Sequence, residues 1–586
     1  MIGVRLGLAA LLLLLAAAHA AALPELWQAV VATPALLWAP GRGWARQRPG
    51  DRWERELRAV WISLGALVVV TVIVRAAGLG PWGVIGGMAI VGGMGVLVPG
   101  PHPTGGRLLG APLAALLLSG FAVWGWRDTL ARPLEGYWYD ARVEEGWEAA
   151  TAVPVTGGGW RSIYALPGGA RAFVPEEDHP FFLGPTEGSM LLLLQGPVGA
   201  RIQTAGVDLR VQASPVEDRE EGPVARYLER GVASTLISPS LAKGARLPVT
   251  VSDPLHSVVI LIPSVDAVWA LHGAGILRHA HYYQLLNMVE QIAWVDGLGS
   301  DGWVTDVQPP LWSWVLAGPI TVTGGGLVTA NVVAGWFVVA ITLAGLVALR
   351  AWSPETPLPA WFLPAAAAAV HCKLIYEPGS ADMPDTLYTF AAVSALGALP
   401  RAGAFAGYGL AAQLSRYPGP LLVGLMAAFV GDTRSLLRLG GTVIVAAALV
   451  GAGGALSGAL PGWIETVWWE TGPEHWHGET DPMVLLGRVP SFYWTWLAYA
   501  GGAPLLAAVA WPRGTRAALG AALVYSLLLA TIDHHPSHYF LPLVQLSALA
   551  VGFTAGALRS RAARWGVSGL SLVGLFITIA LTPVTG

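Results

Sequence analysis

The chain has 586 residues, of which 54% are hydrophobic and only 12% are charged, and its formal net charge is −3. Soluble domains usually carry about a quarter charged residues, so this composition indicates a membrane protein, and the slightly negative charge argues against nucleic acid as a partner. The single cysteine excludes an intrachain disulfide and a zinc site built from cysteines.

Residues 1–126 are predicted to form N-terminal membrane spans. Residues 1–22 carry Arg5 and then an apolar run, a pattern that fits either a cleaved secretory signal or an uncleaved first span. After a weak second span at 25–39, six arginines follow between Arg42 and Arg58. Such a cluster beside a span marks the cytoplasmic side. The next apolar runs, which then cross outward, inward and outward, are 59–76, 82–99 and 108–125.

Residues 127–278 are predicted to be an extracytoplasmic, β-rich domain of the periplasmic type found in a cell envelope. The preceding span ends outside, and the segment holds no apolar run long enough to span a membrane. Short β-type stretches separated by turn residues are typical of an antiparallel sandwich. These stretches are Met190–Gln195, Val207–Gln212, Val249–Val251 and Val258–Ile262.

Residues 279–309 are predicted to be a juxtamembrane outer loop, and 310–586 a C-terminal multi-span domain. Seven arginines of this domain fall on the cytoplasmic side only if one apolar stretch between 310 and 385 fails to cross; they are Arg434, Arg438, Arg513, Arg516, Arg559, Arg561 and Arg564. We expect that stretch to be 359–371, which is shorter than the roughly 20 residues of a typical span. The predicted fold class is therefore a polytopic α-helical membrane protein with about 13–15 spans and an inserted extracytoplasmic β-sandwich-like domain.

Four clusters of ionisable and aromatic residues are predicted to share the outer face, where such groups are costly unless they are used. Each also has a plainer interpretation: tyrosines anchor at interfaces, loop acids are solvated, and a terminal arginine snorkels. The first cluster is His279, Tyr282, Tyr283, Glu290, Asp296, Asp306 and Gln308; the second is Asp382 and Asp385; the third is Arg416; the fourth is His535 and His538, with His475 and His477 in a neighbouring loop.

The order of these motifs resembles the GT-C superfamily of integral-membrane glycosyltransferases, which includes the protein O-mannosyltransferase and aminoarabinose-transferase branches. Residues from His281-Tyr282-Tyr283 to Gln308-Pro309-Pro310-Leu311 look like the family's first outer loop. The other similar segments are Asp382 to Tyr388, Leu414 to Gly419, and His538 to Pro542. The resemblance covers about residues 279–558. Arg278 and His279 stand where the family usually has an acidic residue, so Glu290, Asp296, Asp306 or His279 could replace the missing base.

The resemblance implies an enzyme that transfers a sugar, with inversion, from a polyprenyl-phosphate donor to a glycan, lipid or protein acceptor on the extracytoplasmic side. Such a transfer needs a base for the acceptor and cations or a metal for the leaving phosphate. The expected catalytic residues are Asp382, Asp385, Glu290 and His279, and the residues expected to bind the donor phosphate are Arg416, His535 and His538. The residues expected to contact the acceptor or to shape the loop are Tyr282, Tyr283, Asp296, Asp306 and Gln308. A divalent metal, if the reaction uses one, is expected at Asp382, His475, His477 and His538.

Two alternatives to an enzyme remain open at this point. The first is a non-catalytic GT-C-like membrane scaffold whose outer domain binds a glycan or protein partner, which the absent acidic residue favours. The second is a transporter, which the sequence disfavours because it shows no repeated pair of broken helices in two matching halves.

Overall fold

A computed structural model describes the larger part of the chain. The described residues are 12–21, 23, 25–47, 50–77, 79–97, 110–125, 151–153, 160–175, 181–183, 190–197, 200–204, 207–210, 230–237, 247–253, 258–262, 267, 270–271, 311–323, 327–374, 382–399, 404–416, 418–457, 482–531 and 537–581.

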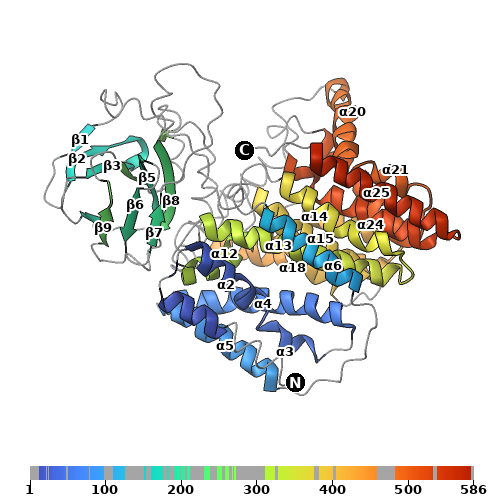
Figure 1. Cartoon of the computed structure of the whole chain (residues 1–586), viewed down its shortest axis with the longest axis horizontal. Coiled ribbons are helices and arrows are strands. Elements are labelled where there is room, and N and C mark those ends of the chain that lie inside the picture. Colours follow the sequence, from blue (N-terminus) through green and yellow to red (C-terminus); the bar gives the residue numbers. More distant parts are fainter. Residues whose placement is uncertain are drawn as a thin grey trace.

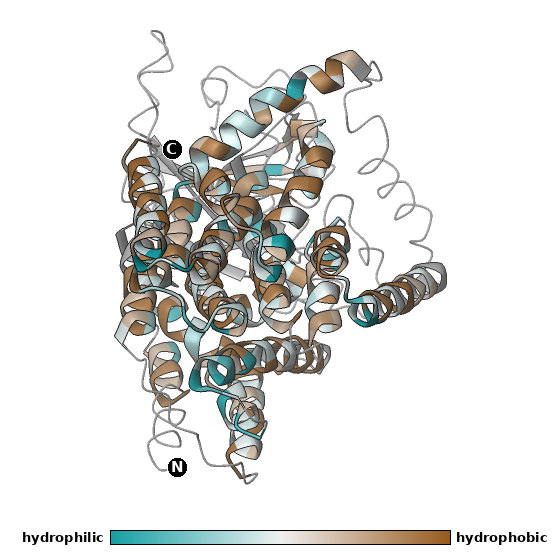
Figure 2. Ribbon diagram, turned by 90° about the vertical axis from the view of Figure 1, so that its right-hand side faces the viewer, coloured by the Kyte–Doolittle hydropathy of each residue, from teal (hydrophilic) through white to brown (hydrophobic). Residues whose placement is uncertain are grey.

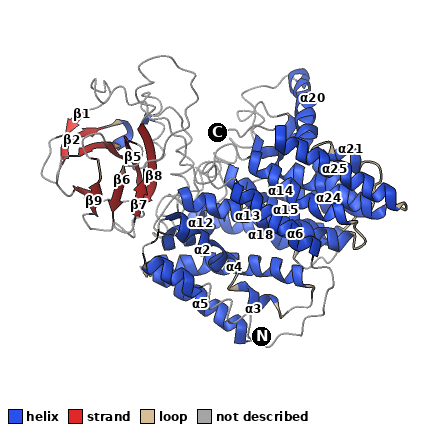
Figure 3. Cartoon of the chain, in the orientation of Figure 1, coloured by secondary structure: helices blue, strands red, loops and turns tan. Residues whose placement is uncertain are grey.

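Helices make up one part of the molecule, and the strands gather apart from them (Figures 1 and 3). The α-helices are α2 (Glu25–Leu37), α3 (Gly41–Ala45), α4 (Arg52–Ala76), α5 (Gly80–Leu97), α6 (Gly110–Gly125), α12 (Leu311–Thr323), α13 (Leu327–Trp352), α14 (Leu363–Leu374), α15 (Asp382–Ala398), α16 (Phe405–Gln413), α17 (Gly419–Phe429), α18 (Thr433–Ser457), α20 (Pro482–Tyr499), α21 (Ala503–Ala507), α22 (Arg513–Thr515), α23 (Ala521–Ala530), α24 (Leu541–Ala557) and α25 (Arg561–Leu581). Short 3₁₀ segments are η1 (Pro167–Gly169), η3 (Leu358–Phe362) and η6 (Ser537–Phe540), and η5 (Arg516–Gly520) is a π-helix.

Five helices in the described part of the chain are long and apolar enough to cross a membrane. They are Arg52–Val74, Gly80–Leu97, Val332–Trp352, His538–Ala557 and Arg561–Leu581. Figure 2 shows the helical part mainly in the brown of hydrophobic residues, with short teal stretches. Apolar helices of this length indicate a polytopic helical membrane protein, while the expected total of 13–15 spans stays a prediction.

The two ends of the helical part differ in charge. Arg350, near the end of α13, forms an ion pair with Asp51, which directly precedes α4 and its arginines. α15 runs parallel to α13, because Phe337 contacts Phe390 and, further along both helices, Trp352 Nε1 donates to the Leu396 carbonyl. We call the end that holds residues 42–58 the arginine end and the opposite end, where α15 begins, the site end.

Three arginines that the charge pattern assigns to the cytoplasmic side, Arg513, Arg559 and Arg564, lie at the arginine end. Gly514, beside Arg513, packs against Trp352 at the end of α13. Gly556, which precedes Arg559, packs against Ser353. Arg564 forms an ion pair with Glu355.

The path of residues 359–371 is at odds with the prediction that this stretch fails to cross. η3 and α14 begin near the arginine end, directly after α13, and reach the site end, where His371 Nε2 lies 3.1 Å from Thr386 Oγ1 of α15. These 17 residues rise about 25 Å, which suffices because α14 packs against α6, α13, α24 and α25 rather than facing lipid.

α12 is the stretch that returns to the end where it starts. Its first residue, Leu311, donates its N–H to the Leu414 carbonyl at the site end. Its last residue, Thr323, hydrogen-bonds to Thr329 at the start of α13, which also lies at the site end. Both ends of α12 therefore lie at the same end of the helical part, and Pro319 interrupts the helix between them.

The strands of the described part all lie between Thr151 and Ile262, inside the predicted β-rich segment. One antiparallel sheet has six strands in the order β1-β2-β3-β10-β5-β8, and a second has four in the order β4-β9-β6-β7. The strands are β1 (Thr151–Val153), β2 (Trp160–Ala165), β3 (Arg171–Pro175), β4 (Phe181–Leu183), β5 (Met190–Pro197), β6 (Arg201–Thr204), β7 (Val207–Arg210), β8 (Arg230–Ile237), β9 (Leu247–Val251) and β10 (Val258–Ile262). The four stretches expected as strands are β5, β7, β9 and β10, although residues 211–212 lie outside the described residues.

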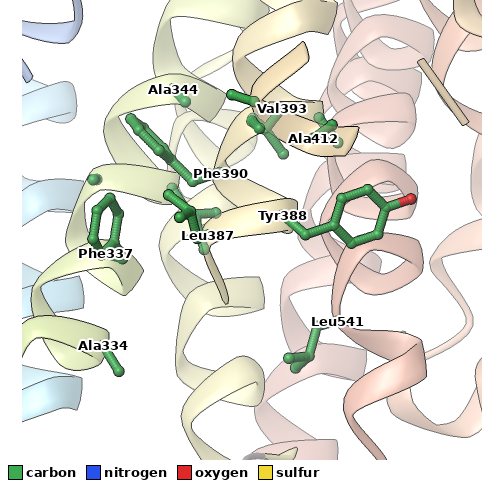
Figure 4. Close-up of a cluster of buried hydrophobic side chains, with 14 of the residues drawn as sticks. Ala334, Phe337, Ala344, Leu387, Tyr388, Phe390, Val393, Ala412 and Leu541 are labelled. Carbon is green, nitrogen blue, oxygen red and sulfur yellow. The ribbon is translucent and has the colours of Figure 1, made fainter. Parts of the chain in front are cut away.

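The helical core lies where α13 and α15 pack side by side. Figure 4 shows Phe337, Leu387 and Phe390 interleaved between these helices, with Tyr388 pointing away from them. The Trp61 ring of α4 stacks on Phe390 at 4.7 Å. This packing holds α15, whose first turn carries the second predicted acidic cluster.

Candidate functional site

Three chain segments from different parts of the sequence meet at the site end. Asp385 lies in the first turn of α15, Arg416 lies in the turn between α16 and α17, and His538 lies in η6 just before α24. Arg416 donates from Nε to Asp385 Oδ1 at 2.8 Å and from Nη2 to Oδ2 at 2.5 Å. His538 Nε2 lies 3.7 Å from the same Oδ2. The structure therefore brings together three predicted site residues, which we call the Asp385 cluster.

The Asp385 cluster is largely removed from solvent. The exposed fractions of the three side chains are 6% for Asp385, 11% for His538 and 16% for Arg416. A charge buried to this degree needs a partner, because desolvation costs several kcal/mol for an isolated ion. The two-point contact between the planar guanidinium and the carboxylate supplies it.

The turn that presents Arg416 is held by short-range contacts. The Arg416 N–H donates to the Ala412 carbonyl at 2.9 Å, and the Gly419 N–H donates to the Arg416 carbonyl at 2.8 Å. A side chain at Gly419 would put its Cβ 2.3 Å from the Ala412 oxygen. Only glycine therefore allows α17 to start this close to the end of α16, and Pro418 directly before it is suited to a helix start.

The end of the predicted first outer loop also reaches this cluster. The hydrogen bond from Leu311 to the Leu414 carbonyl is 3.0 Å long, and Leu414 stands two residues before Arg416. Leu311, the last residue of the Pro-Pro-Leu motif, is thus anchored beside the arginine. The rest of that loop lies outside the described residues.

Further polar side chains adjoin the cluster, and the sequence reasoning missed them. His371 of α14 is 1% exposed and hydrogen-bonds to Thr386, the residue after Asp385. Tyr388 of α15 and Tyr525 of α23 are buried near Asp385 and Arg416. Each stands in an apolar run, His371 directly after five consecutive alanines and Val370, so an isolated polar residue inside a span was the available signal.

Most of the other predicted site residues cannot be placed. His279, Tyr282, Tyr283, Glu290, Asp296, Asp306, Gln308, His475, His477 and His535 lie outside the described residues. Asp382 is the first residue of α15, one turn before Asp385. No group of three or more metal-binding side chains occurs among the described residues. Because His475 and His477 are not among them, the predicted metal site of Asp382, His475, His477 and His538 stays a prediction.

The geometry distinguishes two roles for a carboxylate at this site, positioning the guanidinium of Arg416 and accepting a proton from a substrate. Asp385 is engaged by Arg416 through both oxygens. A carboxylate held in this way orients the guanidinium and balances its charge, and it is poorly placed to take a proton from a substrate.

The chain matches no protein-family model and no curated protein.

Proposed function

We propose that the protein is a membrane glycosyltransferase that transfers a sugar from a polyprenyl-phosphate donor to an acceptor on the extracytoplasmic side. The observation that carries this proposal is the Asp385 cluster, in which a buried arginine is held at the boundary of the helical part by a carboxylate and adjoined by a histidine. A lipid-borne phosphate would meet a cation there while its tail stays among the apolar helices. The resemblance to the GT-C superfamily supports the same substrate class.

In the proposed reaction, the acceptor oxygen attacks the anomeric carbon of the sugar as the bond from that carbon to the phosphate oxygen breaks. The electron pair of the broken bond leaves with the polyprenyl phosphate, whose charge Arg416 and His538 stabilise. The acceptor proton passes to a carboxylate. We assign this base to Asp382, which begins α15, and assign Asp385 the positioning of Arg416.

The extracytoplasmic β-rich segment has the role of acceptor binding in this proposal. Its two antiparallel sheets would pack as a sandwich, the arrangement that pairs one apolar face of each sheet. β10 carries Val259, Ile260 and Ile262, which are all buried. A central strand buried on both faces fits a domain with its own core.

The direct test is transfer of labelled sugar from polyprenyl-phosphate sugars in membranes that contain the protein. Asp382→Asn should lower the rate by about 10²–10⁴-fold, the usual cost of losing a general base. Asp432→Asn, a matched change at the arginine end, should leave the rate unchanged at equal expression. Wild-type transfer from Asp382→Asn would refute the assignment of the base.

A second candidate function is the non-catalytic scaffold, and one observation favours it. The Asp385–Arg416 pair is closed and buried, as a purely structural ion pair would be. A wild-type protein that transfers nothing from a panel of lipid-linked sugars would make this the better proposal.

A further inference from the structure

A second charged region lies at the arginine end, far from the Asp385 cluster. Arg434 and Arg438 stand one turn apart on α18, and Arg513 and Arg516 stand one turn apart where α22 continues into η5. All four side chains are exposed. Arg513 Nη2 donates to the Val430 carbonyl at 3.3 Å, four residues before Arg434, so one short turn connects the two pairs. We call these four residues the α18–η5 arginine patch.

The patch keeps a net positive charge. The acidic residue in the connecting turn is Asp432, whose carboxylate accepts from the Ser435 N–H at 3.0 Å and from the Ser435 hydroxyl at 2.7 Å. This carboxylate therefore caps α18. The four guanidinium groups outnumber the single carboxylate of the connecting turn, and this excess of positive charge favours an anionic ligand.

The face of α18 that carries these arginines continues as an apolar stripe. Positions 434, 437, 438, 441 and 445 share one side of the helix by the 3.6-residue period. Leu437 is 73% exposed and Val445 is 59% exposed. A Cβ added to Gly441, between them, would meet no atom within 4 Å. The opposite side is occupied, since Leu436 and Leu439 pack against Gly424 of α17.

A cluster of cations above an open apolar stripe is complementary to a phospholipid. The phosphate of the lipid headgroup would lie among the arginines, and an acyl chain would follow Leu437, Gly441 and Val445. Trp511, which is 45% exposed and stands two residues before Arg513, is of the type that lies at the membrane interface. We propose that the α18–η5 arginine patch binds an anionic phospholipid of the membrane leaflet at the arginine end.

The test uses the purified full-length protein in detergent, with bound lipid counted by native mass spectrometry during titration with phosphatidylglycerol or phosphatidylcholine. The wild type should bind phosphatidylglycerol more tightly than phosphatidylcholine. Arg434→Gln with Arg438→Gln should weaken its binding about thirty-fold, equivalent to about 2 kcal/mol for two basic residues at an anionic surface. Gly441→Trp, which fills the stripe and changes no charge, should also weaken binding.

The matched control is Arg559→Gln with Arg561→Gln, which removes the same charge at the same end, where the turn after α24 leads into α25. This control should keep the wild-type affinity, and an equal loss in both double variants would mean that surface charge alone attracts the lipid. Glycerol 3-phosphate, which has the headgroup chemistry without the chains, should not compete. Competition by glycerol 3-phosphate, or wild-type binding by Gly441→Trp, would overturn the phospholipid site in favour of a site for a free phosphate.

Discussion

Arg416 and Asp385 form a two-point ion pair across 31 residues of sequence, with the donor nitrogens Nε and Nη2 each facing a different carboxylate oxygen. The pair links the turn after α16 to the first turn of α15, and His538 adds the start of α24. Removing one partner of a buried pair is costly because it leaves an uncompensated charge in a medium of low polarity.

Asp385→Asn should therefore destabilise the protein by about 3–5 kcal/mol, measured as a lower unfolding temperature in detergent. The double variant Asp385→Asn with Arg416→Gln should lose less stability than the sum of the losses in the two single variants, because no buried charge is then left unpaired. Asp382→Asn is the control and should keep the wild-type unfolding temperature while it loses transfer. An unchanged unfolding temperature for Asp385→Asn would show that the pair contributes little to the fold.

Gly574 of α25 is expected to be intolerant of any side chain. A Cβ at this position would lie 2.1 Å from the carbonyl oxygen of Gly501, a backbone atom in the turn before α21. Gly574→Ala should cost about 1–3 kcal/mol, the usual penalty for overpacking. Gly569→Ala, on the same helix, meets no atom within 4 Å and should instead stabilise the protein by up to about 1 kcal/mol through helix propensity. Equal unfolding temperatures for the two variants would contradict this packing.

The sequence was sufficient to place Asp385, Arg416 and His538 together, because charge bias assigned each loop to one end. It could not show which apolar stretch fails to cross. Span length is a good criterion for a helix that faces lipid, and α14 faces other helices, so a shorter helix suffices. α12 has no charged residue that would mark it as non-crossing. The position of its first residue at the site end depends on the contact between Leu311 and Leu414, which joins residues about a hundred positions apart.

The crossing of α14 can be tested by labelling single cysteines in intact cells and after lysis, in a background where the buried Cys372 is replaced by alanine. Leu358→Cys at the arginine end and Lys373→Cys at the site end should react with an impermeant thiol reagent from opposite sides of the membrane. Ser162→Cys in β2 should react from the same side as Lys373→Cys, because we expect the β-rich segment to be extracytoplasmic. Labelling of Leu358→Cys and Lys373→Cys from one side would restore the non-crossing prediction.

Asp432 should stabilise the start of α18 in a pH-dependent manner. The Ser435 hydroxyl and then the Ser435 N–H, which both donate to the Asp432 carboxylate, hold the pKa of this group below its ordinary value of 3.8. A carboxyl group whose pKa is lower in the folded protein than in the unfolded chain, where it is about 3.9, stabilises the fold fully above that higher value. The stabilisation is lost as the pH falls through the lower, folded value.

Asp432→Ala should therefore lower the free energy of unfolding by about 1 kcal/mol at pH 7, the usual cost of losing an N-cap. The difference between the wild type and this variant should persist down to about pH 4 and shrink below it. Unfolding temperatures measured in detergent at pH 7, 5, 4 and 3 would follow this change, with Thr433→Ala, an exposed neighbour, as the control. A difference that stays constant down to pH 3 would mean that the ionised carboxylate is not what stabilises the helix start.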